Sequence, residues 1–230
     1  MLLEQTLNKI RQDFLLANKT TQRDFNYGIH AKVVKEIAGE DYVIDENNKR
    51  ILKLLLYYFN GSPEFENLFD EENYSLKKGL MLVGKIGNGK TSLMKIYNCY
   101  CEHANLPEMK FKIVDVRDVT SYFQRNGNID KYTFNYSLDV YKNEKQNIKH
   151  FCFDDIGTEL NSVKYFGTDS DPISELFLDR YRIFISHRKL THITTNLGIP
   201  AIIERYGERI SDRMKEMFNV IHVSGDSRRK

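Results

Sequence analysis

The sequence has 230 residues and 41% hydrophobic side chains, enough for one packed α/β core, which excludes a wholly disordered protein. Its 34 Lys and Arg residues nearly balance 32 Asp and Glu residues, so the net charge of +2 excludes a strong global attraction to nucleic acid. No apolar run approaches the roughly 20 residues of a membrane span. The N-terminus also lacks the apolar centre of a secretory signal. We therefore expect a cytoplasmic protein that does not associate with membranes.

The N-terminal part of the chain is predicted to be helical. Leu3, Leu7, Ile10 and Phe14 recur at three- and four-residue steps, which indicates an amphipathic helix. A second small helix is predicted over residues 29–37, and a strongly apolar helix over residues 50–59. We expect residues 1–40 to form a helical N-terminal region that could bind a partner. Residues 41–230 are expected to form the main domain.

Residues 79–97, GLMLVGKIGNGKTSLMKIY, combine a short apolar strand, a glycine-rich turn and a helical pattern. This order is the context that a phosphate-binding loop of the G-x-x-x-x-G-K-[ST] type requires. Glycines let successive backbone N–H groups point at phosphate oxygens, and the helix N-terminus adds its dipole. We expect Lys90 to reach the β- and γ-phosphates of ATP and the Thr91 hydroxyl to bind Mg²⁺. The predicted nucleotide-binding residues are Gly84, Gly87, Asn88, Gly89, Lys90, Thr91 and Ser92.

The rest of the main domain alternates between strand and helix patterns. Strands are predicted at residues 80–83, 110–114, 151–153, 192–196 and 220–223, with helices at residues 115–124, 173–187, 199–206 and 208–217. Alternation of this kind predicts a mostly parallel, doubly wound sheet with helices on both faces. Cys99, Cys101 and Cys152 form no recognisable metal-ligand spacing with the scattered histidines, so we expect reduced core or surface thiols.

Two predicted strands end in polar side chains, where a parallel sheet places its ligands. Phe153 is followed by Asp154, which would hold Mg²⁺, and by Asp155, which would orient the attacking water. Asn196 ends the next strand and could position the same water with its amide. A pair of surface acids and a plain Asn turn are the alternative interpretations.

The segment YGERISDRMKEM carries Arg209 and Arg213 four residues apart, hence on one helix face. It is either a solvated charged helix or a helix that presents an arginine to the nucleotide of a neighbouring subunit. An arginine supplied in trans stabilises the charge of the transition state.

The stretches GKIGNGKT, HFCFDDIG, THITTN and YGERISDRM, in this order, resemble the AAA+ ATPases of the DnaC/IstB group, over about residues 80–229. The resemblance implies a P-loop NTPase fold with five parallel strands, the phosphate-loop strand central, and no C-terminal helical lid. By motif, Asn196 resembles sensor 1, Arg213 resembles the trans-acting arginine finger and Arg229 resembles the second sensor arginine. The cofactors would be ATP and Mg²⁺, and many AAA+ proteins carry Glu where Asp155 stands.

The same resemblance implies an ATPase of DNA replication, most like a DnaC-type helicase loader. Such a protein would oligomerise with ATP, bind single-stranded DNA and engage a replicative helicase or another ATPase. Aromatic and cationic residues that could contact DNA lie between the second and third predicted strands: Tyr122, Phe123, Arg125, Lys131, Tyr132, Phe134, Tyr136, Tyr141 and Lys142. Most of these rings could instead be core residues. Two further functions stay open: an IstB-like transposition helper on duplex DNA, and a nucleotide-dependent adaptor with little hydrolysis.

Overall fold

A five-stranded parallel sheet organises the protein, whose computed structural model describes residues 27–40, 42, 44–67, 73–134 and 149–225. The strand order is β2-β3-β6-β1-β7. The strands are β1 (Gly79–Val83), β2 (Phe111–Asp115), β3 (His150–Ile156), β6 (Thr191–Thr195) and β7 (Phe218–His222). Each predicted strand is confirmed. The apolar runs are almost continuous because the sheet is covered on both faces.

One detail implied by the family resemblance is wrong: the phosphate-loop strand is not central. β1 lies between β6 and β7, and β6 holds the middle position. In this order three strands, β2, β3 and β6, lie on one side of β1, and β7 alone lies on the other.

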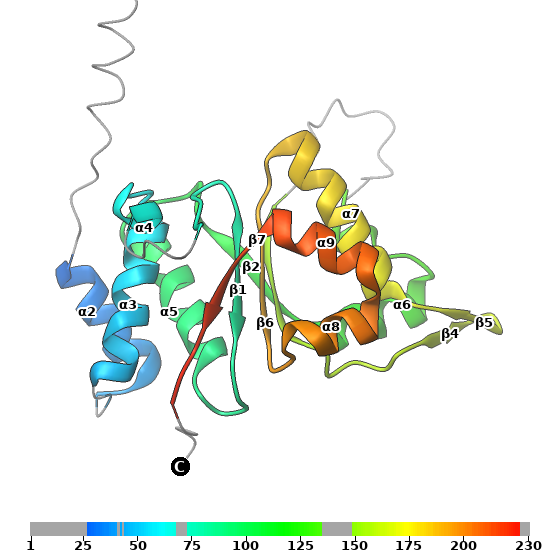
Figure 1. Ribbon diagram of the computed structural model, residues 1–230, viewed down its shortest axis with the longest axis horizontal. Helices are drawn as coiled ribbons and strands as arrows, with labels where there is room; N and C mark the ends of the chain where they lie inside the picture. Colours follow the sequence, from blue (N-terminus) through cyan, green and yellow to red (C-terminus); the bar gives the residue numbers. More distant parts are fainter. Residues whose placement is uncertain (1–26, 41, 43, 68–72, 135–148, 226–230) are drawn as a thin grey trace, which may run out of the picture.

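Helices cover both faces of the sheet (Figure 1). On one side lie α2 (Tyr27–Ala38), α3 (Glu46–Phe59), the short α4 (Glu64–Asn67) and α5 (Lys90–His103). On the other lie α6 (Val116–Asn126), α7 (Pro172–His187), α8 (Ile199–Tyr206) and α9 (Glu208–Met217). A 3₁₀ turn, η1 (Asp130–Tyr132), follows α6. No helix in the described ranges is both long and apolar enough to cross a bilayer.

Helix α2 packs into the main core. Its Val33 and Val34 are 0% and 2% exposed, and His30 Nε2 lies 2.9 Å from the Tyr97 hydroxyl of α5. The division at residue 40 therefore stays a prediction, because the structure joins α2 to the helix that follows the phosphate loop. The predicted helix over residues 3–14 lies outside the described residues.

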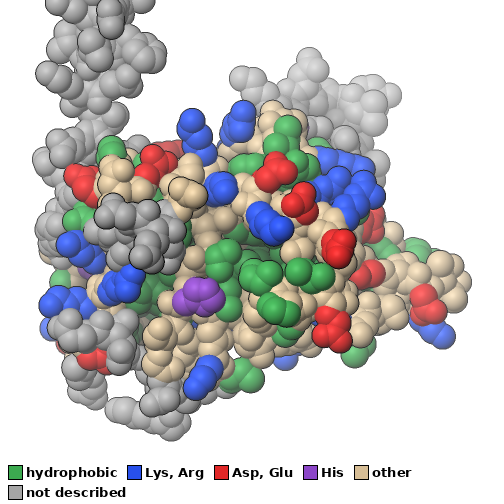
Figure 2. All heavy atoms as spheres, in the orientation of Figure 1, with side chains coloured by type: hydrophobic (Ala, Val, Ile, Leu, Met, Phe, Trp, Pro, Cys, Tyr) green, Lys and Arg blue, Asp and Glu red, His purple; other side chains and the backbone are tan. Residues whose placement is uncertain are grey.

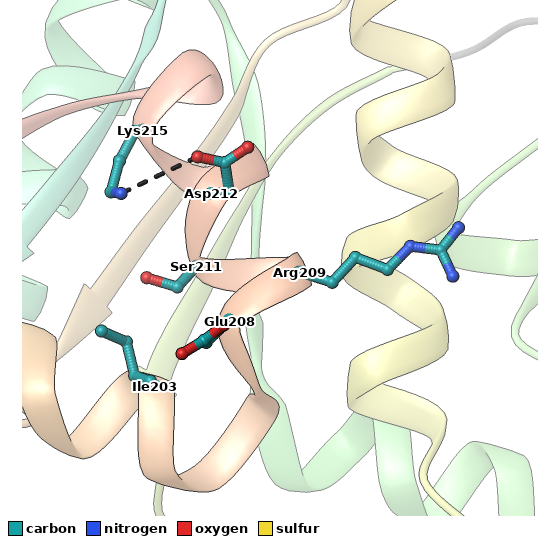
Figure 3. A pocket seen from close by; sticks show the side chains of 6 residues that line it. All are labelled: Ile203, Glu208, Arg209, Ser211, Asp212 and Lys215. Atoms are coloured by element: carbon teal, nitrogen blue, oxygen red, sulfur yellow. Dashed lines mark ion pairs between the residues drawn. The ribbon is translucent and has the colours of Figure 1, made fainter.

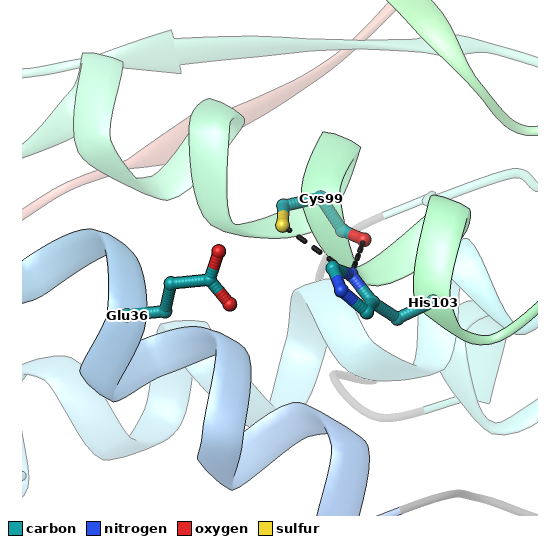
Figure 4. A group of neighbouring side chains, drawn as sticks. All are labelled: Glu36, Cys99 and His103. Atoms are coloured by element: carbon teal, nitrogen blue, oxygen red, sulfur yellow. Dashed lines mark hydrogen bonds between the residues drawn. The ribbon is translucent and has the colours of Figure 1, made fainter.

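The thiols are placed partly as expected. Cys101 and Cys152 are buried, whereas Cys99 is half-buried at the junction of α2 and α5. There its Sγ lies 3.5 Å from Nδ1 of His103, and Glu36 of α2 points toward the pair (Figure 4). The sequence did not indicate this grouping, because Glu36 comes from a different helix and Cys99 and His103 meet only through the four-residue helical step.

A two-stranded hairpin between β3 and α7 is absent from the predicted elements. β4 (Val163–Tyr165) pairs antiparallel with β5 (Thr168–Ser170), and the hairpin projects from the body (Figure 1). Its turn residues Phe166 and Gly167 both have positive φ, 45° and 83°, as a type I′ turn requires. Strands of three residues carry too little alternation to be recognised from sequence.

Candidate functional site

A cavity of about 420 Å³ opens where the strands of the sheet end at their carboxyl side. One wall consists of the phosphate-loop residues Gly87, Gly89, Lys90, Thr91 and Ser92. Arg117, Asp155 and Asn196 also line the cavity. The structure therefore brings residues from four separate parts of the sequence to one cavity, as expected for the edge of a parallel sheet.

The phosphate loop depends on two glycines for different reasons. Gly89 has φ of 93° directly before α5, a left-handed conformation that side chains other than glycine rarely adopt. At Gly84 a Cβ would lie 2.2 Å from Nδ2 of Asn88 and 2.5 Å from the carbonyl oxygen of Val223. The Asn88 amide donates to that same Val223 carbonyl, so it fastens the loop to the end of β7. Gly84 and Asn88 are not among the described residues that line the cavity.

Lys90 is buried and lies over its own loop. Its Nζ donates to the carbonyl oxygens of Gly84 (2.7 Å) and Lys85 (2.8 Å) and to Oδ1 of Asn88 (3.3 Å). These contacts hold the ammonium at the cavity wall, where phosphate oxygens would take the place of the carbonyl oxygens. A buried ammonium needs such partners, because transfer of an unpaired charge from water is costly.

Asp154 lies at the centre of a hydrogen-bond network at the end of β3. Thr91 Oγ1 lies 3.0 and 2.9 Å from its two carboxylate oxygens, and Thr194 Oγ1 donates to Oδ1 at 2.6 Å. Burial raises the pKa of the Asp154 carboxyl, the hydrogen bonds from Thr194 and Thr91 lower it, and the charges of Asp155 and Asp115 raise it. A hydroxyl and a carboxylate so close together are hard oxygen donors that fit Mg²⁺.

A β-bulge places the two adjacent carboxylates of Asp154 and Asp155 in different surroundings. Phe153 pairs with Ile193 and Ile156 with Thr195, so β3 carries one extra residue in this interval. Asp155 has φ of 60°, an uncommon left-handed conformation for a non-glycine residue. Its backbone N–H donates to Thr194 Oγ1 at 2.9 Å. Asp154 therefore faces Thr91, while Asp155 lines the cavity.

Of the two predicted arginines, Arg213 is not among the described residues that line this cavity. Arg213 lies on α9 with its guanidinium 5.0 Å from the centre of the Tyr181 ring of α7. Arg229 lies outside the described residues. Asn196 is exposed and lines the cavity.

Sequence reasoning missed Arg117, Thr194 and Glu159. Arg117 follows a strand without any motif, and Thr194 has no signal apart from its position one residue before the strand end. Glu159 is buried beyond Asp155 and accepts hydrogen bonds from Arg205 Nη2 at 2.7 Å, from the Tyr206 hydroxyl and from the Gly157 N–H. It joins the loop after β3 to α8, and only the buried position distinguishes it from a surface acid.

The solved structures that this chain resembles support the fold. No protein-family model and no curated protein matches the sequence. A structure of DnaI aligns with a TM-score of 0.54 at 20% identity, over 85% of this chain and 93% of that one. A structure of the DnaC helicase loader aligns with a TM-score of 0.51 at 20% identity, over 80% of this chain and 94% of that one. The chain therefore has the α/β P-loop NTPase fold of these two structures, as its sequence motifs predict.

Proposed function

We propose that the chain is an Mg²⁺-dependent ATPase that works in DNA replication as a DnaC-like helicase loader. The observation that carries the proposal is the meeting of Lys90, Thr91, Asp155 and Asn196 at one cavity, with Asp154 hydrogen-bonded to Thr91. The fold likeness to the structure of a helicase loader supports the replication role. In this proposal the protein acts in the cytoplasm and assembles into homo-oligomers when ATP is bound.

Each cavity residue has a distinct part in the proposed reaction. The backbone of the loop and Lys90 bind the phosphates, and Thr91 with Asp154 would hold Mg²⁺, which offsets phosphate charge. Asp155 accepts a proton from the attacking water or orients it, and Asn196 positions the same water with its amide. Arg229 would act as a second sensor.

Arg213 would act on the nucleotide of a neighbouring subunit. Its helix α9 is amphipathic, with Ile210, Met214 and Met217 buried and charged residues outward. Figure 3 shows Arg209 extending from α9 away from the other side chains drawn, which line a cavity of about 550 Å³ beside α8. Lys, Arg, Asp and Glu side chains are interspersed over α7 and α9 (Figure 2). Both signs of charge on this face suit contact with a second copy of the chain better than uniform contact with DNA.

Single-stranded DNA would bind beside α6 and the hairpin. Phe123 and Tyr132 are buried, so these two rings belong to the core, while Arg125 and Lys131 are exposed. Tyr136, Tyr141 and Lys142 of the predicted DNA-contacting set lie outside the described residues. Phe166 at the hairpin tip is 92% exposed, and the neighbouring Tyr165 ring lies 5.9 Å from the Phe123 ring. An exposed aromatic ring suits base stacking, and the exposed cations Arg125 and Lys131 suit contact with phosphates.

The test is ATP hydrolysis by the purified protein without DNA, with single strands and with duplex, each across protein concentration. A rate that rises with concentration and with single strands supports the loader. Lys90→Ala should abolish nucleotide binding, whereas Lys95→Ala, an exposed lysine of the same helix, should leave it unchanged. Stimulation by duplex alone would favour the transposition helper. Tight ATP binding with negligible hydrolysis under every condition would favour the adaptor.

A further inference from the structure

Arg117 is a cation of the cavity to which the predicted nucleotide contacts assign no role. Its side chain extends from the first turn of α6 and is 65% exposed. Among the described residues that line the cavity, Lys90 and Arg117 are the cationic side chains. We propose that Arg117 binds the terminal phosphate of ATP from within the same subunit. This inference rests on the nucleotide-binding function proposed above.

The geometry of Arg117 suits a phosphate. Its Nε lies 3.0 Å from Oδ1 of Asp115 and its Nη2 lies 2.6 Å from Oδ2, a two-pronged contact. The same planar pair of N–H donors fits two oxygens of a phosphate group. Asp115 also accepts the backbone N–H of Arg117 at 2.8 Å and caps α6. That cap survives when the guanidinium leaves, so movement of the side chain does not require the helix to unwind.

The sheet positions the guanidinium beside the catalytic carboxylates. In the parallel pairing of β2 with β3, Asp115 lies opposite Asp154. The first turn of α6 therefore starts next to the end of β3, where the bulge directs Asp155 into the cavity. The pKa of Arg117 is raised mainly by its hydrogen bond to Asp115, and the charge of Asp155 contributes too, which agrees with a guanidinium near both acids.

Charge explains why an arginine is useful here. The terminal phosphate brings negative charge toward Asp154 and Asp155, and like charges at close range repel. A second cation in the same cavity as Lys90 offsets that repulsion. The exposed Arg117–Asp115 pair contributes little to stability, so its opening costs little. ADP lacks the terminal phosphate, and with ADP bound Arg117 stays on Asp115. Arg117 thus makes the site prefer ATP to ADP.

The test compares the affinity of the full chain for Mg²⁺–AMPPNP and for Mg²⁺–ADP by isothermal titration calorimetry. Arg117→Ala should weaken AMPPNP binding by about tenfold or more and change ADP binding by less than about twofold. Arg182→Ala is the matched control, since Arg182 is also an exposed arginine paired with a nearby aspartate, Asp179 at 3.0 Å on α7. It should change neither affinity.

A second variant tests the competition with Asp115. Asp115→Asn keeps a good helix cap but removes the charge that holds Arg117. It should strengthen AMPPNP binding roughly two- to fivefold and leave ADP binding unchanged. Far-UV circular dichroism establishes that each variant is folded.

The outcomes separate this inference from the proposed function. Wild-type protein that binds neither nucleotide overturns the ATPase proposal itself. Wild-type protein that binds both, with Arg117→Ala equal to it for AMPPNP, overturns only the role of Arg117. An equal loss of AMPPNP and ADP affinity in folded Arg117→Ala also overturns it. ADP lacks the terminal phosphate, so loss of a contact with that phosphate cannot weaken ADP binding.

Discussion

The hydroxyl of Thr194 donates a hydrogen bond of 2.6 Å to Asp154 and accepts one of 2.9 Å from the backbone N–H of Asp155. Thr194 is fully buried in β6, so its rotamer is fixed by packing as well as by these two bonds. One side chain of a neighbouring strand therefore sets the positions of both acids. The two consecutive acids share this one hydrogen-bonding side chain, although Asp154 faces Thr91 and Asp155 lines the cavity.

Thr194→Val should move the acid limb of ATP hydrolysis to higher pH. Burial already raises the pKa of Asp154, and the Thr194 hydrogen bond opposes that rise by stabilising the charged form. Loss of the bond raises the pKa further, so Asp154 protonates at a higher pH and Mg²⁺ binding is lost there. The measurement is the hydrolysis rate from pH 4.5 to 8. Thr168→Val in the exposed hairpin is the control, and an unmoved acid limb would contradict the prediction.

Asp154→Asn should stabilise the protein against heat while removing Mg²⁺-dependent hydrolysis. A carboxyl whose pKa is raised on folding destabilises the native state once the pH rises above its unfolded pKa. Asparagine keeps an acceptor for Thr91 and Thr194 without the charge. We expect the melting temperature at pH 7.5, without nucleotide, to rise by about 2–4 °C, which is about 1 kcal/mol for a domain of this size. A lower melting temperature would be the contrary result.

Arg213→Ala should leave nucleotide binding intact but remove DNA-stimulated hydrolysis. The decisive experiment mixes this variant with Lys90→Ala. If Arg213 acts in trans, an intact site on an Arg213→Ala subunit receives the arginine of a Lys90→Ala neighbour, and activity returns on mixing two inactive proteins. Arg209→Ala, with the same charge change one helical turn earlier, serves as comparison. Normal hydrolysis by Arg213→Ala alone excludes the trans role.

Glu159→Ala should destabilise the fold by about 3–5 kcal/mol, because it leaves a partly buried arginine without its carboxylate. The Glu159 side chain is 0% exposed and that of Arg205 is 14% exposed, with 2.7 Å between Oε1 and Nη2. Glu204→Ala on the exposed side of α8 should change stability by less than about 0.5 kcal/mol. Urea unfolding measures both. Equal midpoints for the two variants would show that the buried pair contributes nothing.

His192 should make the protein lose stability below pH 6.5. Burial lowers its pKa from 6.5 to about 3, with further lowering by His150 and Arg180, so the ring is neutral and its Nδ1 accepts from the Leu80 N–H at 3.1 Å. Between pH 6.5 and 3 the unfolded chain binds a proton that the native ring does not. Stability therefore falls with the pH, by about 1.4 kcal/mol per unit for one such group.

His192→Gln should reduce the change in unfolding free energy per pH unit by the equivalent of about one bound proton. Glutamine can still accept the hydrogen bond but does not titrate. The measurement is urea unfolding at several pH values between 4 and 7. His187→Gln, the same change at an exposed ring, is the control. A slope unaffected by His192→Gln would assign the acid sensitivity to other groups.

Most of the fold followed from local patterns. The five apolar runs and the helical spacing between them predict a parallel sheet, since an element buried on both faces must be almost continuously apolar. The phosphate loop was recognisable because its glycines and Lys90 occur at fixed offsets in a strand–turn–helix context. The order of strands was predicted less well, because which neighbour a strand pairs with depends on packing rather than on its own residues.

The site was only partly predictable for a similar reason. The bulge at Asp155 has no signal in the letters FCFDDIG, because it arises from a register difference between β3 and β6. Arg117 can be recognised as a residue of the cavity only from the structure, because the pairing of Asp115 with Asp154 brings α6 to the cavity. Contacts between distant segments produce no periodic pattern in the sequence, whereas the spacing of residues within one helix does.

Helix α5 connects two places that the chain order keeps apart. Its first residue, Lys90, lies at the cavity, and from Tyr97, about 10 Å further along its axis, the helix packs against α2. A rigid rod held at one end by phosphate moves its far end by more than its near end when it tilts. A tilt of α5 that depends on the bound nucleotide would therefore be transmitted to α2, which packs against the second half of α5.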